Sequence, residues 1–231
     1  DVYKRQEEMD VVFLMDRFGY AKTVDVSVYE RNKEAADTEN RYILTCKNTD
    51  KICIFTNKGQ MHLLKVLDLP YGKFRDKGIP IDNLSNYDSS EENFIYIINL
   101  GAIIHSRLLF GTKTAMLKMV DGSEFDVAKR TTAATKLNED DELLIVHAMT
   151  GEETVVMQSE KEMFLRIEAS TIPEKKKGAV GVRGMKLNAG DALSNIYVLD
   201  GENEQTVEVK GKEVVLNRLR VGNRDTKGTK R

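Results

Sequence analysis

Residues 51–66 read KICIFTNKGQMHLLKV, and this stretch decides the fold class. Apolar residues with high strand propensity lead up to a short polar turn at Gly59, and a second apolar stretch carrying Lys65 follows that turn. Two such stretches on either side of a short glycine-containing turn are typical of a β-hairpin. We therefore predict two antiparallel strands here.

The same pattern recurs four more times, at intervals of roughly 40 to 55 residues. The other predicted hairpins are VVFLMDRFGYAKTVD (11–25), RLLFGTKTAMLKMV (107–120), ETVVMQSEKEMFLRIE (153–168) and EQTVEVKGKEVVLNRLRV (204–221). A repeat of this period indicates a radial or stacked all-β architecture, because one unit cannot bury its own apolar face alone.

Basic loops recur with the same period as the hairpins. The loops after hairpins two, four and five end in Lys-Gly; these are KFRDKG (73–78), EKKKG (174–178) and NRDTKG (223–228). The loop after hairpin three, AKRTTAATK (128–136), is also basic but lacks the glycine. A strand-like stretch and an acidic turn come next, which makes about four strands per unit, as in a propeller blade. We predict blades at roughly 7–50, 51–100, 101–150, 151–200 and, incomplete, 201–231.

The first six residues, DVYKRQ, match the translation of a common sequencing-adaptor end, and we exclude them from the fold. We accordingly expect the natural protein to extend upstream of residue 7. The polar segment ERNKEAADTEN (30–40) lacks an apolar stripe, which favours a loop or a single turn over a helix.

Composition excludes several classes of protein. With 231 residues, 41% hydrophobic and 31% charged, the chain suits a soluble β domain, and no apolar run approaches the roughly 18 residues of a membrane span. Cys46 and Cys53 are expected to be reduced core thiols, which fits the cell interior. The three histidines lack metal-ligand spacing, and we expect neither a metal site nor catalytic residues in this chain.

The distribution of charge indicates a polyanionic partner. The chain has a formal net charge of −2, yet each of the four loops carries a net positive charge. If the units are arranged radially, equivalent loops share one rim, where lysines and arginines can neutralise the phosphates of a bent polyanion. Basic residues also recur on the second hairpin strands, and strand alternation can place them outside, beside the loops; they are Lys22, Lys65, Lys118 and Arg166.

At these residues the chain resembles the C-terminal β-pinwheel of the A subunits of bacterial type IIA DNA topoisomerases, the gyrase and topoisomerase IV family. The stretch FTNKGQMHLLKVLDLPYGKFRDKGIPIDNL (55–84) is similar to the family's x-x-x-G turn, K-V-x-x-L-P link and R-x-x-G-x-P-I-x-N-L run. Two further stretches are similar to the family's G-V-R-G-I-x-L-x-x-G-D and G-Y-x-K-x-x-x-x-x-Y patterns, namely KKKGAVGVRGMKLNAGD (175–191) and FGYAKTVDVSVYE (18–30).

The resemblance implies a β-pinwheel that binds and bends duplex DNA around its outer rim during strand passage, with little sequence dependence. Rim contacts implied by the resemblance, together with the charge pattern at 128–136, are Lys22, Lys65, Lys73, Arg75, Lys77, Lys129, Arg130, Lys175, Lys176, Lys177, Arg183, Arg224, Lys227 and Lys230. It also implies a cytoplasmic, nucleoid-associated bacterial protein with no cofactor in this chain. ATP and Mg²⁺ would act through a partner topoisomerase B subunit, and a second copy of the A subunit would join through a missing N-terminal core.

One departure distinguishes the two branches of the family. In gyrase the first blade carries a box of the type Q-R-R-G-G-K-G, whereas this chain has ERNKEAADTEN (30–40) after Tyr29. The resemblance is therefore closer to topoisomerase IV, which relaxes and decatenates DNA. The alternative is a propeller that binds proteins through loop aromatics, for which Tyr71, Phe74 and Tyr87 are the candidates.

Overall fold

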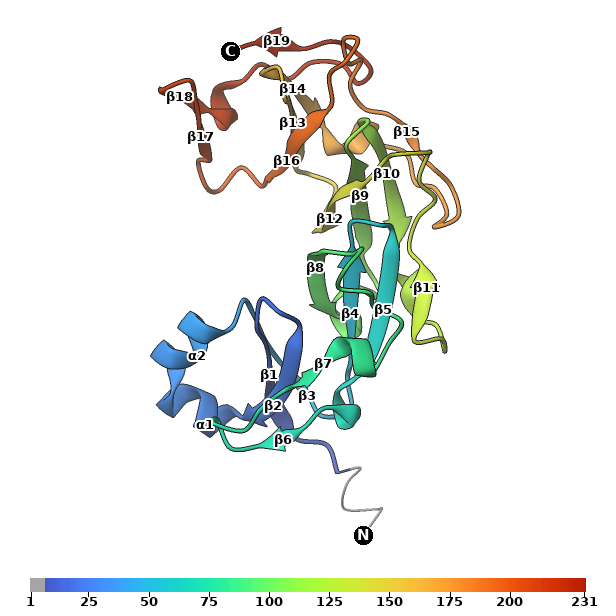
Figure 1. The fold of residues 1–231 in the computed structure, drawn as a ribbon. Coiled ribbons are helices and arrows are strands. Elements are labelled where there is room, and N and C mark those ends of the chain that lie inside the picture. The colour runs from blue at the N-terminus through green and yellow to red at the C-terminus, as the bar shows by residue number, and fades with distance from the viewer. Residues whose placement is uncertain (1–6) are drawn as a thin grey trace. The chain divides into compact units, whose positions relative to one another are not determined.

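All five predicted hairpins form in the computed structural model, which describes residues 7–231 (Figure 1). The six residues attributed to an adaptor lie outside the described range. The chain divides into two units: the first runs to residue 56 and adds 60–102 and 126–132, and the second comprises 57–59, 103–125 and 133–231.

Unit 1 contains two antiparallel-dominated sheets, each built on one hairpin. The first sheet has the order β3-β1-β2-β6, with β7 also paired to β2; its strands are β1 (Asp10–Met15), β2 (Tyr20–Asp25), β3 (Tyr42–Lys47), β6 (Tyr71–Gly72) and β7 (Ile79–Pro80). The second sheet has the order β8-β4-β5-β11; its strands are β4 (Lys51–Thr56), β5 (Gln60–Lys65), β8 (Phe94–Asn99) and β11 (Thr131–Ala133).

Unit 2 repeats this arrangement twice and adds a lone hairpin. The third sheet has the order β12-β9-β10-β15; its strands are β9 (Arg107–Thr112), β10 (Met116–Asp121), β12 (Leu143–Met149) and β15 (Val182–Arg183). The fourth sheet has the order β16-β13-β14-β19; its strands are β13 (Thr154–Ser159), β14 (Met163–Glu168), β16 (Leu193–Leu199) and β19 (Thr229–Lys230). The last hairpin pairs β17 (Thr206–Val209) with β18 (Lys212–Val215).

Each four-stranded sheet takes its outer strand from beyond the next hairpin in the chain. The strand β15, for example, pairs with β10 although the whole β13–β14 hairpin lies between them in sequence. Each sheet therefore combines strands from two of the ranges assigned to successive blades, and those ranges stay a prediction. Within each unit, this exchange ties the two main sheets together.

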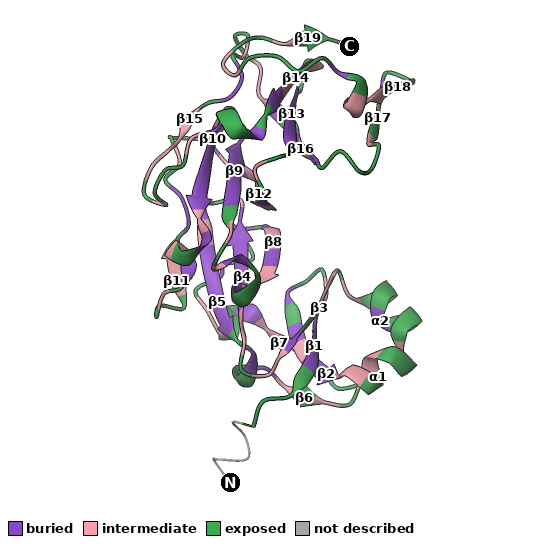
Figure 2. Ribbon diagram, turned by 180° about the vertical axis from the view of Figure 1, so that it is seen from behind, coloured by how far each residue is buried: buried purple, intermediate pink, exposed green. Residues whose placement is uncertain are grey.

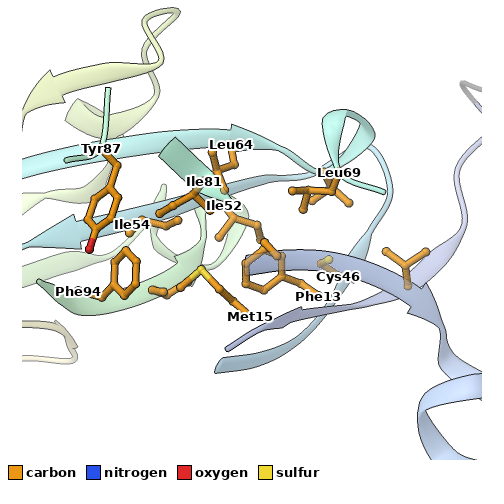
Figure 3. Packing of buried hydrophobic residues seen from close by; sticks show 14 residues of the cluster. Phe13, Met15, Cys46, Ile52, Ile54, Leu64, Leu69, Ile81, Tyr87 and Phe94 are labelled. Carbon is orange, nitrogen blue, oxygen red and sulfur yellow. The ribbon is translucent and has the colours of Figure 1, made fainter. Parts of the chain in front are cut away.

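The hydrophobic core of unit 1 follows from strand alternation. Phe13 and Met15 of β1 point to one face, where they pack with Ile52 and Ile54 of β4 (Figure 3). Unit 2 has a corresponding cluster that joins residues of β9 and β10 to residues of β13 and β14. Figure 2 shows that the central hairpin strands of the second and third sheets are mostly buried, whereas the loops around them are exposed.

The segment predicted to be a loop or single turn is helical, and that prediction was wrong. It contributes the last two residues of α1 (Val26–Arg31) and all of α2 (Lys33–Glu39), and a third short helix, α3 (Leu100–Ile103), follows β8. Ala36 is fully buried against Val12 and Leu14, which lie on the face of β1 opposite the main core. The apolar contact that stabilises the helices thus comes from residues outside the segment and from a single small side chain within it.

Among residues 7–231, no helix is long and apolar enough to cross a membrane. Within the same residues, no cluster of three histidine, cysteine, aspartate or glutamate side chains is arranged to hold a metal ion.

Candidate nucleic-acid interface

The basic loops run along the second strand of each of the first four hairpins. We call them the outer loops and define them as residues 71–80, 128–133, 174–183 and 221–230. Backbone hydrogen bonds fix the third loop on β10, because Met119 N donates to Pro173 O at 3.0 Å and Lys175 N donates to Met119 O at 2.8 Å. On the fourth sheet the same register is held by Gly222 N, which donates to Arg166 O at 2.7 Å.

Within each unit, the outer loops of the two sheets lie on the same side. In unit 1 the strands β3 and β8 are in contact, and each lies at the edge of its sheet opposite the outer loop. The strands β12 and β16 meet in the same way in unit 2. Two sheets that converge at one edge and enclose a core between their faces present their other edges on a common outer side, so the basic loops of each unit lie on that side.

In unit 2 the two outer loops touch directly. Asp225 N donates to Gly184 O at 2.9 Å, and Arg224 donates through Nη1 to Arg183 O at 3.0 Å. The Arg183 guanidinium also forms an ion pair with Asp225, with Nε 2.6 Å from Oδ1. These contacts join two predicted basic corners into one continuous surface.

In unit 1 the outer surface is continuous through residues 79–86, since Asn86 N donates to the Thr131 hydroxyl at 3.3 Å. A small cavity of about 50 Å³ lies beside this contact, and four of its lining residues are cationic: Lys51, Lys65, Lys129 and Arg130. The predicted residues are thus brought together within each unit, and their union into one track along the whole chain stays a prediction.

Most of the predicted contact residues are exposed to solvent. The exposed ones are Lys65, Lys73, Arg75, Lys77, Lys129, Arg130, Lys175, Lys176, Arg183, Lys227 and Lys230. Their ammonium and guanidinium groups are accessible to a phosphate without any rearrangement of the backbone.

Lys22, Lys177 and Arg224 are only half-exposed, and their cationic groups donate hydrogen bonds to backbone carbonyl groups in or beside the loops. The Lys177 ammonium donates to Glu124 O at 3.1 Å, and Arg224 donates through Nε to Thr171 O at 3.2 Å. Lys22 donates to the carbonyl oxygens of Phe74 and Asp76 at 2.5 and 2.9 Å. Lys22 thus holds carbonyl groups of the first outer loop, whereas Lys177 and Arg224 fasten their own loops to neighbouring backbone. The charge pattern alone predicted neither role.

Lys118 was expected to point outward beside the loops, and that expectation was wrong. Its side chain is 1% exposed and lies beneath the third outer loop, where the ammonium donates to the carbonyl oxygens of Lys176, Lys177 and Ala179. Burial lowers the pKa of Lys118 to about 8, an effect that the carboxylate of Glu124 opposes. The three carbonyl acceptors likewise favour the charged form.

His62 occupies the corresponding place in the second sheet. It is 1% exposed, with Nδ1 at 2.9 Å from the Thr131 hydroxyl of the outer loop and Nε2 at 3.0 Å from the buried carboxylate of Glu92. In the sequence, His62 is one of three scattered histidines with nothing to single it out. The structure shows that it precedes Leu63, whose backbone N donates to Arg130 O of the outer loop, and this makes His62 the counterpart of Lys22 and Lys118.

The glycines of the loops pack against the second hairpin strands. A Cβ at Gly78 or Gly228 would lie 2.8 Å from Ala21 O or 2.2 Å from Phe164 O, which real side chains do not tolerate. Gly178 has open space around it, and Gly181, which would meet Leu117 O at 2.6 Å, takes the equivalent place in the third loop. Close approach to the strand therefore explains these glycines better than close approach to a phosphate.

The groups considered for other functions are mostly buried. Cys46 and Cys53 are free thiols whose pKa values burial raises to about 11 and about 12, so neither is a nucleophile near neutral pH. Of the loop aromatics, Tyr71 is exposed, Phe74 lies under the Lys22 ammonium and Tyr87 is buried. A binding surface made of three aromatic anchors is not formed.

Residues 106–148 and 153–200 match a protein family described as the DNA gyrase C-terminal domain, β-propeller. The chain is 28% identical to the DNA gyrase A protein of Lawsonia intracellularis over 95% of its length, and 29% identical to that of Staphylococcus epidermidis strain ATCC 12228 over 96%. It covers 29% and 27% of these relatives, and thus spans less than a third of their length.

Solved structures confirm the predicted class of fold. The crystal structure of the C-terminal domain of DNA topoisomerase IV is similar with a TM-score of 0.86 and 22% identity, over 97% of this chain and 73% of that chain. The E. coli ParC C-terminal domain is similar with a TM-score of 0.79 and 14% identity, over 96% and 94%. The C-terminal domain of DNA gyrase A gives a TM-score of 0.63 and 17% identity, over 96% and 76%.

Proposed function

We propose that this chain, which belongs to the C-terminal domains of type IIA topoisomerase A subunits, binds duplex DNA along its outer loops and bends it during strand passage. The observation that carries the proposal is the contact between the third and fourth outer loops. It places Lys175, Lys176, Lys227 and Lys230 along adjoining sheet edges with their side chains exposed. Cations along the edges of two successive sheets suit a backbone that follows a curve.

Binding by this surface depends little on base sequence. The helices α1 and α2 are six and seven residues long, and acidic residues outnumber basic ones in α2. Neither presents a basic helix face for a DNA groove. Exposed lysines on loops contact phosphates, which position the duplex without reading its bases.

A topoisomerase IV type of activity, relaxation and decatenation, fits the first blade better than gyrase activity does. At the place expected for the gyrase box the chain forms α1 and α2, and the residues from Glu30 to Asn40 include no glycine. When a relaxed nicked plasmid is sealed in the presence of this chain, we expect little shift in linking number. A large positive shift would instead indicate gyrase-like wrapping.

We propose that two copies of the intact A protein pair with each other and with B subunits that bind ATP and Mg²⁺, and that the enzyme acts in the bacterial cytoplasm on the nucleoid. The lengths of the gyrase A relatives, of which this chain covers under a third, support a larger protein around it.

The test is charge reversal in the third outer loop. For the double variant Lys175→Glu and Lys176→Glu, we expect affinity for linear duplex DNA to fall at least about tenfold, equally for different sequences. The slope of log affinity against log salt should lose roughly two units, about 0.9 for each phosphate contact. Fluorescence anisotropy over a salt series measures both quantities.

The matched control is Lys161→Glu with Lys212→Glu, which makes the same change in net charge in unit 2 but outside the outer loops. This control should keep nearly all of its affinity, apart from a small uniform loss. Equal losses in the two double variants would show that only net charge matters, and unchanged binding by the loop variant would refute the outer-loop interface. A chain that binds no duplex DNA but retains a protein partner after nuclease treatment would favour the protein-binding alternative.

A further inference from the structure

Lys22 and Lys118 occupy the same position in their respective sheets. Each is the third residue of the second hairpin strand, and each precedes the residue that bonds in parallel to the outer loop, Thr23 with Tyr71 and Met119 with Glu174. Counting along the loops from these bridges makes Phe74 equivalent to Lys177 and Asp76 equivalent to Ala179.

The two lysines donate to these equivalent carbonyl groups. Lys22 Nζ donates to Phe74 O and Asp76 O, and Lys118 Nζ donates to Lys177 O at 3.2 Å and Ala179 O at 2.6 Å. Lys118 adds a third acceptor, Lys176 O, at 3.0 Å. An ammonium group has three N–H donors, so the Lys118 site matches each donor with one carbonyl.

The fourth sheet lacks this lysine. By the same register, Leu165 stands where Lys118 stands in the third sheet, and Arg166 beside it donates to Asn217 O and Leu219 O, before the fourth loop begins. A hollow of about 480 Å³ opens here, with Leu165, Thr226 and Lys227 among its lining residues. The fourth outer loop, which has neither this lysine nor a histidine in its place, thus has open space beside it.

We propose that Lys22 and Lys118 are positioning residues, which bind the carbonyl groups of the first and third outer loops and hold the exposed lysines of those loops ready for phosphate. The inference rests on the proposed DNA-binding function. Fixing the backbone of a loop costs conformational entropy. A loop ordered before binding avoids that cost when DNA arrives, as preorganised binding sites do.

The first measurement is amide hydrogen exchange of the free chain, which does not depend on DNA. Lys118→Met keeps a long, flexible side chain but removes the ammonium group and its three donors. We expect amides of residues 174–183 to exchange roughly tenfold faster or more in this variant, and those of the fourth loop to be unchanged. Lys22→Met should have the same effect on residues 71–80, and because Lys22 is half-exposed this variant tests the idea even if Lys118→Met fails to fold. The reciprocal change Leu165→Lys should slow exchange in residues 221–230.

The second measurement separates positioning from direct contact. Lys118→Met should weaken duplex DNA binding severalfold while the salt slope stays the same, because Lys118 touches no phosphate. A slope reduced by about 0.9 would show that Lys118 itself contacts DNA and would overturn the proposal. Unchanged exchange in both methionine variants would overturn it too. If the natural chain bound no duplex DNA, the proposed function would fail, whereas faster exchange would still support the holding of the loops.

Discussion

The third and fourth sheets of unit 2 share one architecture and differ at one decisive residue. Their strand orders correspond, their outer strands pair in the same register, and Gly181 and Gly228 both lie against the second hairpin strand. Yet Lys118 fills the space under the third loop, whereas Leu165 leaves a hollow under the fourth. The glycine is therefore part of the backbone geometry that both sheets share, whereas Lys118 is a separate feature that orders the third outer loop alone.

The largest effect is expected at the shared glycines. Gly181→Ala and Gly228→Ala each force a Cβ against a strand carbonyl and place alanine at a positive φ, 105° and 72°. We expect each to lower the free energy of unfolding by about 3 kcal/mol, as for a strained backbone combined with overpacking. Chemical denaturation measures the loss.

The matched control for this prediction is Gly178→Ala, since that glycine has open space and no strained φ. It should change stability by no more than about 0.5 kcal/mol. Equal losses at Gly178 and Gly181 would contradict the equivalence of the two loops.

A smaller effect concerns the pH dependence of stability. Burial holds the pKa of Lys118 at about 8, below its ordinary value of 10.5, so between these values the unfolded chain binds more protons than the folded one. Stability therefore rises with pH across this window, by about 1 kcal/mol between pH 7.5 and 9 from this group. Denaturation at both pH values should show a rise in the natural chain that exceeds the rise in Lys118→Met by this amount. Leu165→Ala, which alters the same position of the fourth sheet without a titrating group, should leave the rise intact.

The smallest effect is expected where the two loops meet. Asp225→Asn removes the partner of Arg183 in a partly exposed ion pair but keeps a residue that tolerates the positive φ of 63°. Stability should fall by less than about 1 kcal/mol. Duplex DNA affinity should rise about two- to threefold, because Arg183 gains freedom and the surface loses a negative charge. Anisotropy at fixed salt tests this, and a loss of affinity would indicate that the ion pair orders the loops for binding.

Sequence reasoning predicted the hairpins because strand alternation and turn composition act over a few neighbouring residues. Residues 51–66 form β4 and β5 as expected, and so do the four other hairpins. Composition likewise placed exposed cations in the loops, as at Lys73, Lys175 and Lys227. The sequence-based prediction failed for the helical segment of α1 and α2. The apolar contact of that segment, made by Ala36, depends on Val12 and Leu14 on the face of β1 away from the main core.

The sequence by itself determined the all-β repeat, the family resemblance and the basic character of the loops, since each of these is written in local pattern and composition. Tertiary structure alone decided which cations face solvent and which hold the loops. Lys118 and Lys175 are both lysines in a repeating basic pattern, but one lies under a loop that arrives from beyond the next hairpin and the other lies on top of it. That distinction arises because the outer strand of each sheet is contributed by a distant part of the chain, and no local pattern records which side chains it will cover.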